Sequence, residues 1–434
     1  MRSYSIAQIL FKYPSLASGS LDVLSSLTNT GEPYYVLTGG GNRMVLLNKS
    51  DYINHVLREQ SNKFIRSKAL GRIISFLSDG IFAKDSDEWN EHRTNMQPIF
   101  RPNQIQTIWK DVFLMFQSFF DELSDKKDKI DVEKEMKDFM LEVIFKIYFL
   151  KELPFNKSKV SFLVDDLIIK TNVYNHSIKE LIDHLKRSVG IKKRSDLPHS
   201  FYELQQIVED IYIYAEKNKD SRGLLFNSMY GKVSKEHLKG EICSLLFAGY
   251  DTVSSCLNWS LYELCKNPDW VKKIQNESQG FDLSEMNFLK ELKETKKFVS
   301  EILRLYPSVT LIPRIAIEDS ICGDLEFKKG DFIFISPFLL HRLEEIWDKP
   351  YNFNPERFKN FTATDKSKIY MPFGAGKMTC VGNHLAISLI SLGVVMMSRQ
   401  FCFELINKEK PRFLINTVIK SKKSLKIQNK NFSL

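Results

Sequence analysis

Residues 372–382 limit what this chain can fold into more than any other stretch, and they read Pro-Phe-Gly-Ala-Gly-Lys-Met-Thr-Cys-Val-Gly. The three glycines allow left-handed backbone torsions and a close approach to a flat object. Cys380 precedes an apolar run at 385–398, where the dipole and free N–H groups of an expected helix favour its thiolate. Such a thiolate is either a nucleophile or a ligand for a soft or borderline metal. A buried free cysteine is the simpler interpretation, but it leaves the spaced aromatic residue and glycines unexplained.

Length and composition describe a globular protein with a large interior. The chain has 434 residues, enough for one large domain or two smaller ones. Its 43% hydrophobic and 26% charged residues are ordinary for that class. The 32 Phe residues fit a large apolar core or pocket.

The net charge of +9 allows an anionic membrane surface, an acidic protein or nucleic acid as partner. Apart from a short cluster at 192–194 the basic residues are scattered, so nucleic-acid binding is not favoured. The six cysteines include no C-x-x-C pair and no zinc-type spacing with histidine. We find no signal peptide and no apolar run of about 18 residues. We therefore expect a cytoplasmic protein without a transmembrane anchor.

Hydrophobic periodicity predicts a mainly α-helical chain with a smaller β-rich subregion. In the first half we expect a β-hairpin at 34–48 and helices at 50–59, 88–96, 105–152 and, with breaks at Gly190, 196–198 and Gly223, across 155–232. In the second half we expect helices at 234–267, 285–305 and from Cys380 to about 399, and strands within 310–336, 401–406 and 414–427.

The pattern Phe373-x-x-Gly376-x-x-x-Cys380-x-Gly382 resembles the haem-ligand loop of the cytochrome P450 family, the haem-thiolate monooxygenases. The resemblance implies haem b (iron protoporphyrin IX) as cofactor, with Cys380 as the axial ligand of the iron. Phe373, Gly374 and Gly382 would contact the cofactor. The resemblance also implies one cytochrome P450 domain over 1–434, with 34–60 and 310–336 contributing mostly to the β-rich subregion.

Trp89 and Arg93 lie one helical turn apart, with His92 between them. Alone, the spacing fits an amphipathic helix with a half-buried Trp and a solvated Arg. It also resembles the family's W-x-x-x-R element, which binds a haem propionate. Arg314 matches a second propionate-binding arginine. The resemblance therefore implies a cofactor-binding group of Trp89, His92, Arg93 and Arg314.

Glu301 and Arg304 share one face of an expected helix. This spacing is common, and a surface pair of that kind contributes about 0–1 kcal/mol. With Arg357 in the downstream Pro-Glu-Arg-Phe element, however, the pair resembles the family's buried triad behind the haem loop. We expect a structural network of Glu301, Arg304 and Arg357, without a catalytic role.

Ala248-Gly249-Tyr250-Asp251-Thr252 interrupts an apolar helix, and a mid-helix glycine costs about 1 kcal/mol relative to alanine. A helix kink with Asp251 facing water would explain it structurally. The segment also resembles the family's A-G-x-D/E-T motif. That resemblance implies that Thr252 stabilises bound dioxygen and that Asp251 relays protons.

One position departs from the family pattern. Two residues before the ligand cysteine the family usually has Arg or His, which pairs with a propionate, whereas this chain has Met378, preceded by Lys377. Methionine cannot donate a hydrogen bond, so one charge-assisted contact of about 1.5–3 kcal/mol is missing. We expect haem to be retained, although less tightly.

The resemblance implies an oxidoreductase that inserts one oxygen atom from O2 into a lipophilic molecule such as a fatty acid or terpene. Electrons would come from a separate ferredoxin or flavodoxin-type donor and its reductase, as in soluble bacterial systems. The substrate pocket would be lined by apolar residues of the two distal segments, namely Phe247, Ala248, Val309, Thr310, Leu311 and Ile312. Two alternatives stay open: a peroxide-driven or isomerase-type enzyme on the same fold, and a haem-binding protein without turnover.

Overall fold

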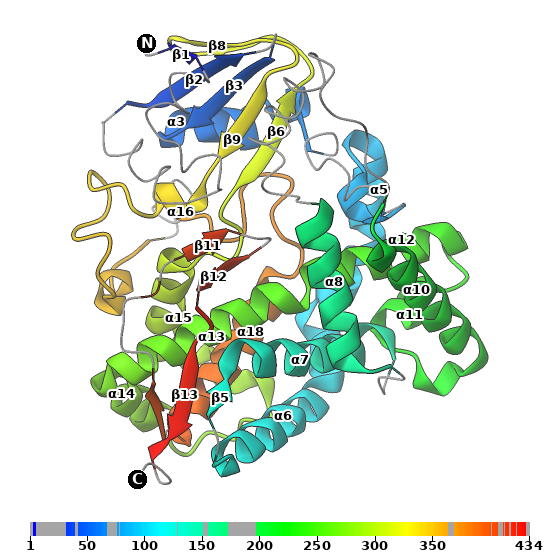
Figure 1. Cartoon of the computed structure of the whole chain (residues 1–434), viewed down its shortest axis with the longest axis vertical. Coiled ribbons are helices and arrows are strands. Elements are labelled where there is room, and N and C mark those ends of the chain that lie inside the picture. The colour runs from blue at the N-terminus through cyan, green and yellow to red at the C-terminus, as the bar shows by residue number, and fades with distance from the viewer. Residues whose placement is uncertain are drawn as a thin grey trace.

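In the computed structural model the described part of the chain holds a β-sheet at one end and a larger helical region at the other (Figure 1). The described residues are 3–5, 32–39, 42–66, 76–77, 79–127, 129–150, 155–171, 197–362, 369–400, 402–406, 411, 413–415, 418–421 and 423–430. The break expected at Gly190 lies outside them. Among these residues, no helix combines the length and apolar character needed to cross a bilayer.

The main sheet joins segments that are far apart in the sequence. Its strand order is β1(Ser3–Ser5), β2(Tyr34–Gly39), β3(Asn42–Leu47), β9(Phe332–Ile335), β6(Ile312–Ala316) and β4(Phe64–Ile65). The strands β2 and β3 form the predicted hairpin, and β3 then pairs in parallel with β9. Residues from 34–60 and 310–336 therefore share one sheet, which confirms the predicted β-rich region.

The helical region contains the longer helices of the chain. Their bounds are α5(Ser86–Met96), α6(Pro102–Asp125), α7(Val132–Ile144), α8(Lys157–Thr171), α10(His199–Lys217), α11(Leu224–Met229), α12(Lys235–Ala248), α13(Tyr250–Lys266), α14(Pro268–Ser278), α15(Lys293–Leu305) and α18(Asn383–Arg399). Shorter helices are α3(Ser50–Asn54) and α16(Pro337–Leu340), and a π-helical turn follows α3 at His55–Glu59. The remaining strands are β5(Ile130–Asp131), β7(Ser320–Cys322), β8(Leu325–Phe327), β10(Phe403–Leu405), β11(Phe413–Ile415), β12(Ile419–Ser421) and β13(Lys426–Asn429).

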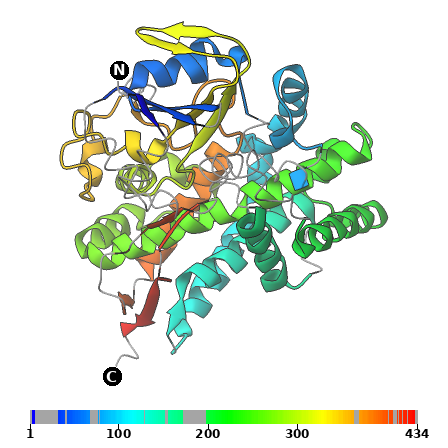
Figure 2. The ribbon, with the colours of Figure 1, turned by 45° about the horizontal axis from the view of Figure 1, so that its top comes forward.

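The core of the helical region is built around α13 and α18. The helix α18 is buried along nearly its whole length, as its apolar sequence predicts. It packs on α13, and α13 packs in turn on α7. In Figure 2, α12 and α13 follow each other across the middle of the molecule. This arrangement places the break between α12 and α13 at the centre of the fold.

The structure divides two segments that the periodicity predicts as single helices. The segment 105–152 is split because β5 pairs with β13, and the Asp131 carboxylate then accepts the N–H of Lys134 to begin α7. The segment 285–305 is split because α15 begins only at Lys293, where the Glu277 carboxylate accepts the N–H groups of Glu294 and Thr295. Both divisions depend on residues outside the segment.

The expected kink at Gly249 is present as a break between α12 and α13. The Thr252 hydroxyl donates to the carbonyl of Ala248 at 2.8 Å, and the Ser308 hydroxyl donates to the carbonyl of Thr252 at 2.8 Å. Side-chain donors therefore satisfy helix carbonyls at the break.

Candidate functional site

A cavity of about 290 Å³ lies between α5, the α12–α13 break, β6, α18 and the loop that carries Cys380. Its lining is mostly apolar, with a few charged and polar groups. It brings together thirteen of the residues singled out from the sequence: Trp89, Arg93, Phe247, Ala248, Thr252, Val309, Leu311, Ile312, Arg314, Phe373, Gly374, Cys380 and Gly382. Segments from across the chain therefore meet at one cavity.

The cysteine loop is folded tightly. The N–H of Cys380 donates to the carbonyl of Phe373 at 3.0 Å, and the Thr379 hydroxyl donates to the carbonyl of Gly376 at 2.7 Å. Gly376 has φ +72°, and a Cβ there would lie 1.8 Å from the carbonyl oxygen of Leu57. Only glycine fits this position, because both the torsion and the space exclude a side chain.

The thiol of Cys380 opens on the cavity, and the groups around it act on its pKa in opposite directions. Burial raises that pKa, and the N–H of Gly382 and the charge of Arg93 offset only part of the rise, so the net shift is upward. The Arg93 guanidinium also donates to the carbonyl of Thr379 at 2.9 Å. Arg93 and the N–H of Gly382 are the two groups here that would stabilise the thiolate form of the sulfur.

Two arginines at the cavity are withdrawn from solvent: Arg314 is buried and Arg66 is half-buried. Burial lowers the pKa of Arg314 to about 9, and the nearby Arg66 contributes to that shift. Burial likewise lowers the pKa of Arg66 to about 10. The Nε of Arg66 and the Nε1 of Trp89 are buried, with no hydrogen-bond partner among the described residues. Because arginine stays protonated in proteins, an anion bound in the cavity would compensate the charge of both guanidinium groups.

The donor set fits the haem that the resemblance implies. Haem carries two propionate groups, and the cavity offers the cations Arg66, Arg93 and Arg314 together with the unpaired indole N–H of Trp89. Lys377 lies close by, with its Nζ 5.9 Å from the centre of the Trp89 ring. Together with Cys380, these groups could bind both the carboxylates and the iron of the cofactor.

Sequence reasoning missed Arg66. The residue follows the short strand β4, which pairs with β6, the strand that contains Arg314. No local pattern marks Arg66, since its relation to Arg314 exists only through this pairing. An arginine directly after an apolar strand was the one available indication.

Asp251 does not line the main cavity. It is 2% exposed and lies on the other side of α13, where its Oδ1 is 3.3 Å from the Nζ of Lys137 and 3.7 Å from that of Lys420. Lys137 also bonds Asp165 at 2.5 Å. Burial alone would lower the pKa of Lys420. The nearby carboxylates of Asp251, Asp165 and Glu133 outweigh that effect, so the net shift of the pKa is upward. The kinked helix therefore presents Thr252 to the cavity and Asp251 to a buried charge cluster.

The structure brings the three expected network residues together behind the cysteine loop. Arg304 and Glu301 are fully buried and form two hydrogen bonds, of 2.7 and 2.8 Å. Arg357 donates to the same carboxylate at 3.1 Å. Arg304 further donates to the carbonyls of His341 and Pro350, both at 2.7 Å. The network thus ties α15 to the irregular segment that precedes the cysteine loop.

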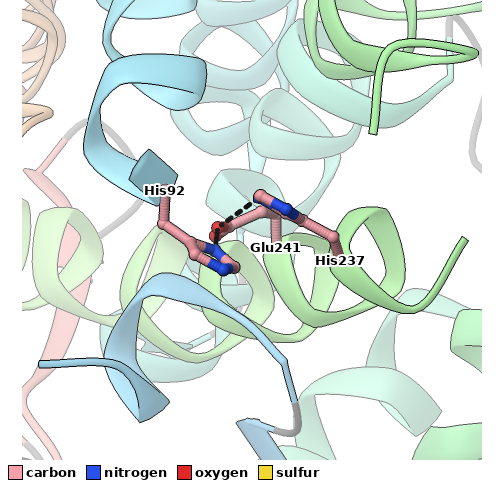
Figure 3. Close-up of side chains that lie close together, drawn as sticks. All are labelled: His92, His237 and Glu241. Carbon is pink, nitrogen blue, oxygen red and sulfur yellow. Dashed lines mark hydrogen bonds and ion pairs between the residues drawn. The ribbon is translucent and has the colours of Figure 1, made fainter. Parts of the chain in front are cut away.

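Besides Asp251, two further expected residues are not brought to the cavity. Thr310 is buried but is absent from the lining, unlike its neighbours Val309 and Leu311. His92 is also absent, because its Nδ1 lies 2.6 Å from Glu241 Oε1 and its ring stacks on His237 (Figure 3). The helix α5 thus directs Trp89 and Arg93 to the cavity and His92 elsewhere, so we do not retain His92 as a haem contact.

Comparison with known proteins gives one consistent result. The family model described as Cytochrome P450 matches residues 3–429. The protein LUTEIN DEFICIENT 5, chloroplastic, of Arabidopsis thaliana is 24% identical over 406 residues, covering 85% of this chain and 67% of that protein. A cytokinin hydroxylase of the same plant is 24% identical over 381 residues, covering 83% and 73%. Cytochrome P450 3A14 of Cavia porcellus is 25% identical over 404 residues, covering 85% and 78%.

Proposed function

The chain belongs to the cytochrome P450 family of haem-dependent monooxygenases, and we propose that it inserts one oxygen atom from O2 into an apolar small molecule. The observation that supports this most strongly is that Cys380 and Thr252, from distant segments, line the same cavity. The cofactor of the family is haem b. When bound, it supplies a thiolate-ligated iron at which dioxygen is activated.

We assign Cys380 as the iron ligand and the surrounding cations as propionate partners. Arg314 is buried and Arg66 is half-buried, burial lowers the pKa of both, and the N–H of Trp89 has no partner among the described residues. Arg93 has two contacts of interest: it donates to the carbonyl of Thr379, next to Cys380, and it also lines the cavity. Charge-assisted hydrogen bonds of this kind contribute about 1.5–3 kcal/mol each.

We propose that residues on both sides of α13 take part in proton delivery. Asp165 is one-third exposed and bonds the buried Lys137, whose Nζ lies 3.3 Å from Asp251. A proton taken from solvent at Asp165 can therefore reach the Asp251 carboxylate through Lys137. The Thr252 hydroxyl stands on the cavity side, where it donates to Ala248 in the resting arrangement.

The cavity supports an apolar substrate of the fatty-acid or terpene class. Phe247, Ala248, Val309, Leu311 and Ile312 line it with apolar surface. One relative is described as a cytokinin hydroxylase, and at 24% identity that name supports only the general class of small organic substrate.

Electrons would come from a separate ferredoxin or flavodoxin-type protein with its reductase. The net charge of +9 supports an acidic partner, because opposite charges steer two proteins together. The match over residues 3–429 supports the proposal of a single domain. The cytoplasmic location and the soluble bacterial type remain predictions.

The direct test is the visible spectrum of the purified, reduced protein under carbon monoxide. We expect the red-shifted Soret band of thiolate ligation, and we expect Cys380→Ala to lose it. A screen of fatty acids, terpenes and steroids for substrate-induced spin shifts would then identify the substrate class. Absence of the thiolate-type band in the wild-type protein would contradict the assignment of Cys380.

One observation favours the peroxide-driven or isomerase-type alternative: two lysines hold Asp251 away from the cavity. The two functions separate by electron source. We expect turnover with a ferredoxin–reductase pair, and we expect Asp251→Asn to slow it while leaving peroxide-supported turnover unchanged. Turnover with peroxide, together with none from the ferredoxin–reductase pair, would favour the alternative.

A further inference from the structure

His92, His237 and Glu241 form a buried cluster beside the haem cavity that the proposed reaction does not use (Figure 3). His92 comes from α5, and the other two residues come from successive turns of α12. Glu241 is fully buried, and the two histidines are 4% and 6% exposed. Within the described ranges, this is the one group of three His, Cys, Asp or Glu side chains with ligand atoms close enough to hold a metal ion.

The cluster is incompletely satisfied by its own hydrogen bonds. Glu241 Oε1 lies 2.6 Å from His92 Nδ1 and 3.6 Å from His237 Nε2. The second distance is too long for a hydrogen bond. The buried Nε2 of His237 accordingly has no partner among the described residues, although it is aimed at the carboxylate. A buried nitrogen left in this state is costly unless something else binds it.

We propose that His92, His237 and Glu241 bind a divalent metal ion of the zinc class. Two imidazole nitrogens and one carboxylate oxygen are a ligand set typical of zinc, with a fourth position left for water. Ligand atoms on a tetrahedral zinc ion lie roughly 3.3 Å apart, from bond lengths of about 2.0–2.1 Å. The present spacings of 2.6 and 3.6 Å lie on either side of that value.

Binding requires only local rearrangement. The imidazole rings now stack with centres 3.6 Å apart and planes 19° apart. They must turn about their Cβ–Cγ bonds so that both nitrogens point at one ion. Glu241 is held from its other side, since its Oε2 accepts the N–H of Ile81 at 3.2 Å.

The backbone around the cluster is packed too closely to collapse further. A Cβ on Gly240 would lie 2.2 Å from the nitrogen of Gly80, so α12 touches the segment 79–83 directly. In the same segment, the carbonyl of Ile81 accepts a hydrogen bond of 2.5 Å from Arg66, which lines the haem cavity. A metal ion here would join α5 to α12 just behind Trp89 and Arg93. The ion would thereby act as a structural clamp near the propionate-binding face.

Zinc content of the haem-loaded protein tests the proposal. The protein is purified without a histidine tag, treated with a chelator, equilibrated with Zn²⁺ and analysed for zinc and iron per chain by mass spectrometry. We expect one zinc per chain in addition to the haem iron. Glu241→Gln and His237→Asn should each weaken zinc binding more than about 100-fold, because losing even an outer-shell partner costs 10–100-fold.

His199 and Glu203 provide a matched control. They have the same four-residue spacing on α10 and lie 2.8 Å apart, but His199 is exposed. His199→Ala should leave the zinc content unchanged. The iron content of each variant reports its folding, and zinc-edge X-ray absorption of the wild-type protein provides a test that needs no variant. Two imidazole ligands and no sulfur are expected. A wild-type protein without bound zinc, or zinc with sulfur ligands, would overturn the proposal.

Discussion

Gly376 is the residue of the cysteine loop with the least freedom to change. Its φ of +72° constrains the torsion, and the Leu57 carbonyl oxygen, which would lie 1.8 Å from a Cβ on residue 376, constrains the space. Leu57 lies in the π-helical turn at His55–Glu59, far from the loop in sequence. The loop that presents Cys380 is therefore positioned partly by the sheet end of the molecule.

The cost of the backbone torsion and the cost of the steric contact can be separated by comparing Gly376 with Gly231. Gly231 has a similar φ of +76° but nothing within 4 Å of its Cβ position. Gly231→Ala should therefore cost about 1–2 kcal/mol, the usual cost of a left-handed alanine. Gly376→Ala should cost considerably more and should remove most of the bound haem, measured as haem per purified chain. Equal haem content in the two variants would show that the contact with Leu57 is unimportant.

Met378 leaves the proposed propionate site without one usual donor, and Lys377, with its Nζ 5.9 Å from the centre of the Trp89 ring, is the nearest candidate to replace it. We predict that Met378→Arg slows haem loss by about 10–100-fold, which corresponds to one charge-assisted contact. Lys377→Met should accelerate it. Transfer of haem to excess apomyoglobin measures both rates. If Met378→Arg leaves the rate no slower, the departure at this position has no effect on haem affinity.

At the scale of elements, α15 and the 3-10 helix Pro355–Phe358 show how similar charges can contribute very differently. Glu301 is fully buried between Arg304 and Arg357, whereas Glu356 is 43% exposed between Lys273 and Lys297. Removing one member of a buried network leaves an uncompensated charge. Removing Glu356 leaves Lys273 exposed to solvent and Lys297 still paired with Glu294 at 2.8 Å.

We predict that Arg304→Ala costs about 3–5 kcal/mol in urea unfolding at pH 7, whereas Glu356→Gln costs at most about 1 kcal/mol. The two lysines lower the pKa of Glu356 to about 2 from its ordinary 4.5. Its contribution is therefore complete above pH 4.5 and is lost as the pH falls toward 2. The difference between wild type and Glu356→Gln should shrink over that interval, and a constant difference would contradict the assignment.

For the whole molecule, the net charge of +9 is the property that a redox partner meets first. Raising the salt concentration from about 0.1 M to about 1 M shortens the Debye length from about 10 Å to about 3 Å. Electron transfer from an acidic ferredoxin should then slow on the order of tenfold, as steering is lost. Stopped-flow reduction measures the rate, with peroxide-supported turnover as the salt-insensitive control. A rate unaffected by salt would argue against an acidic partner.

The sequence was sufficient to predict features that are encoded locally. The cysteine loop, the buried helix after it, the hairpin at 34–48 and the break at Gly249 each have a short, readable pattern. Features that depend on distant contacts were not predictable. Arg66 reaches the cavity only because β4 pairs with β6, and β5 divides α6 from α7 only because β13 lies beside it. His92 was assigned to the wrong neighbour for the same reason, since nothing near it in sequence indicates His237 or Glu241.

The break in the central helix makes α13 a partition. Consecutive residues, Asp251 and Thr252, face two separate compartments, one charged and one apolar. The compartment for organic molecules can consequently be reshaped through residues such as Val309 or Leu311 without disturbing the charged one. If protons follow the proposed route through Lys137 and Asp251, changes at Lys137 or Lys420 would adjust their supply without altering the shape presented to a substrate. On that proposal, selectivity and proton supply would be independent traits of a single scaffold.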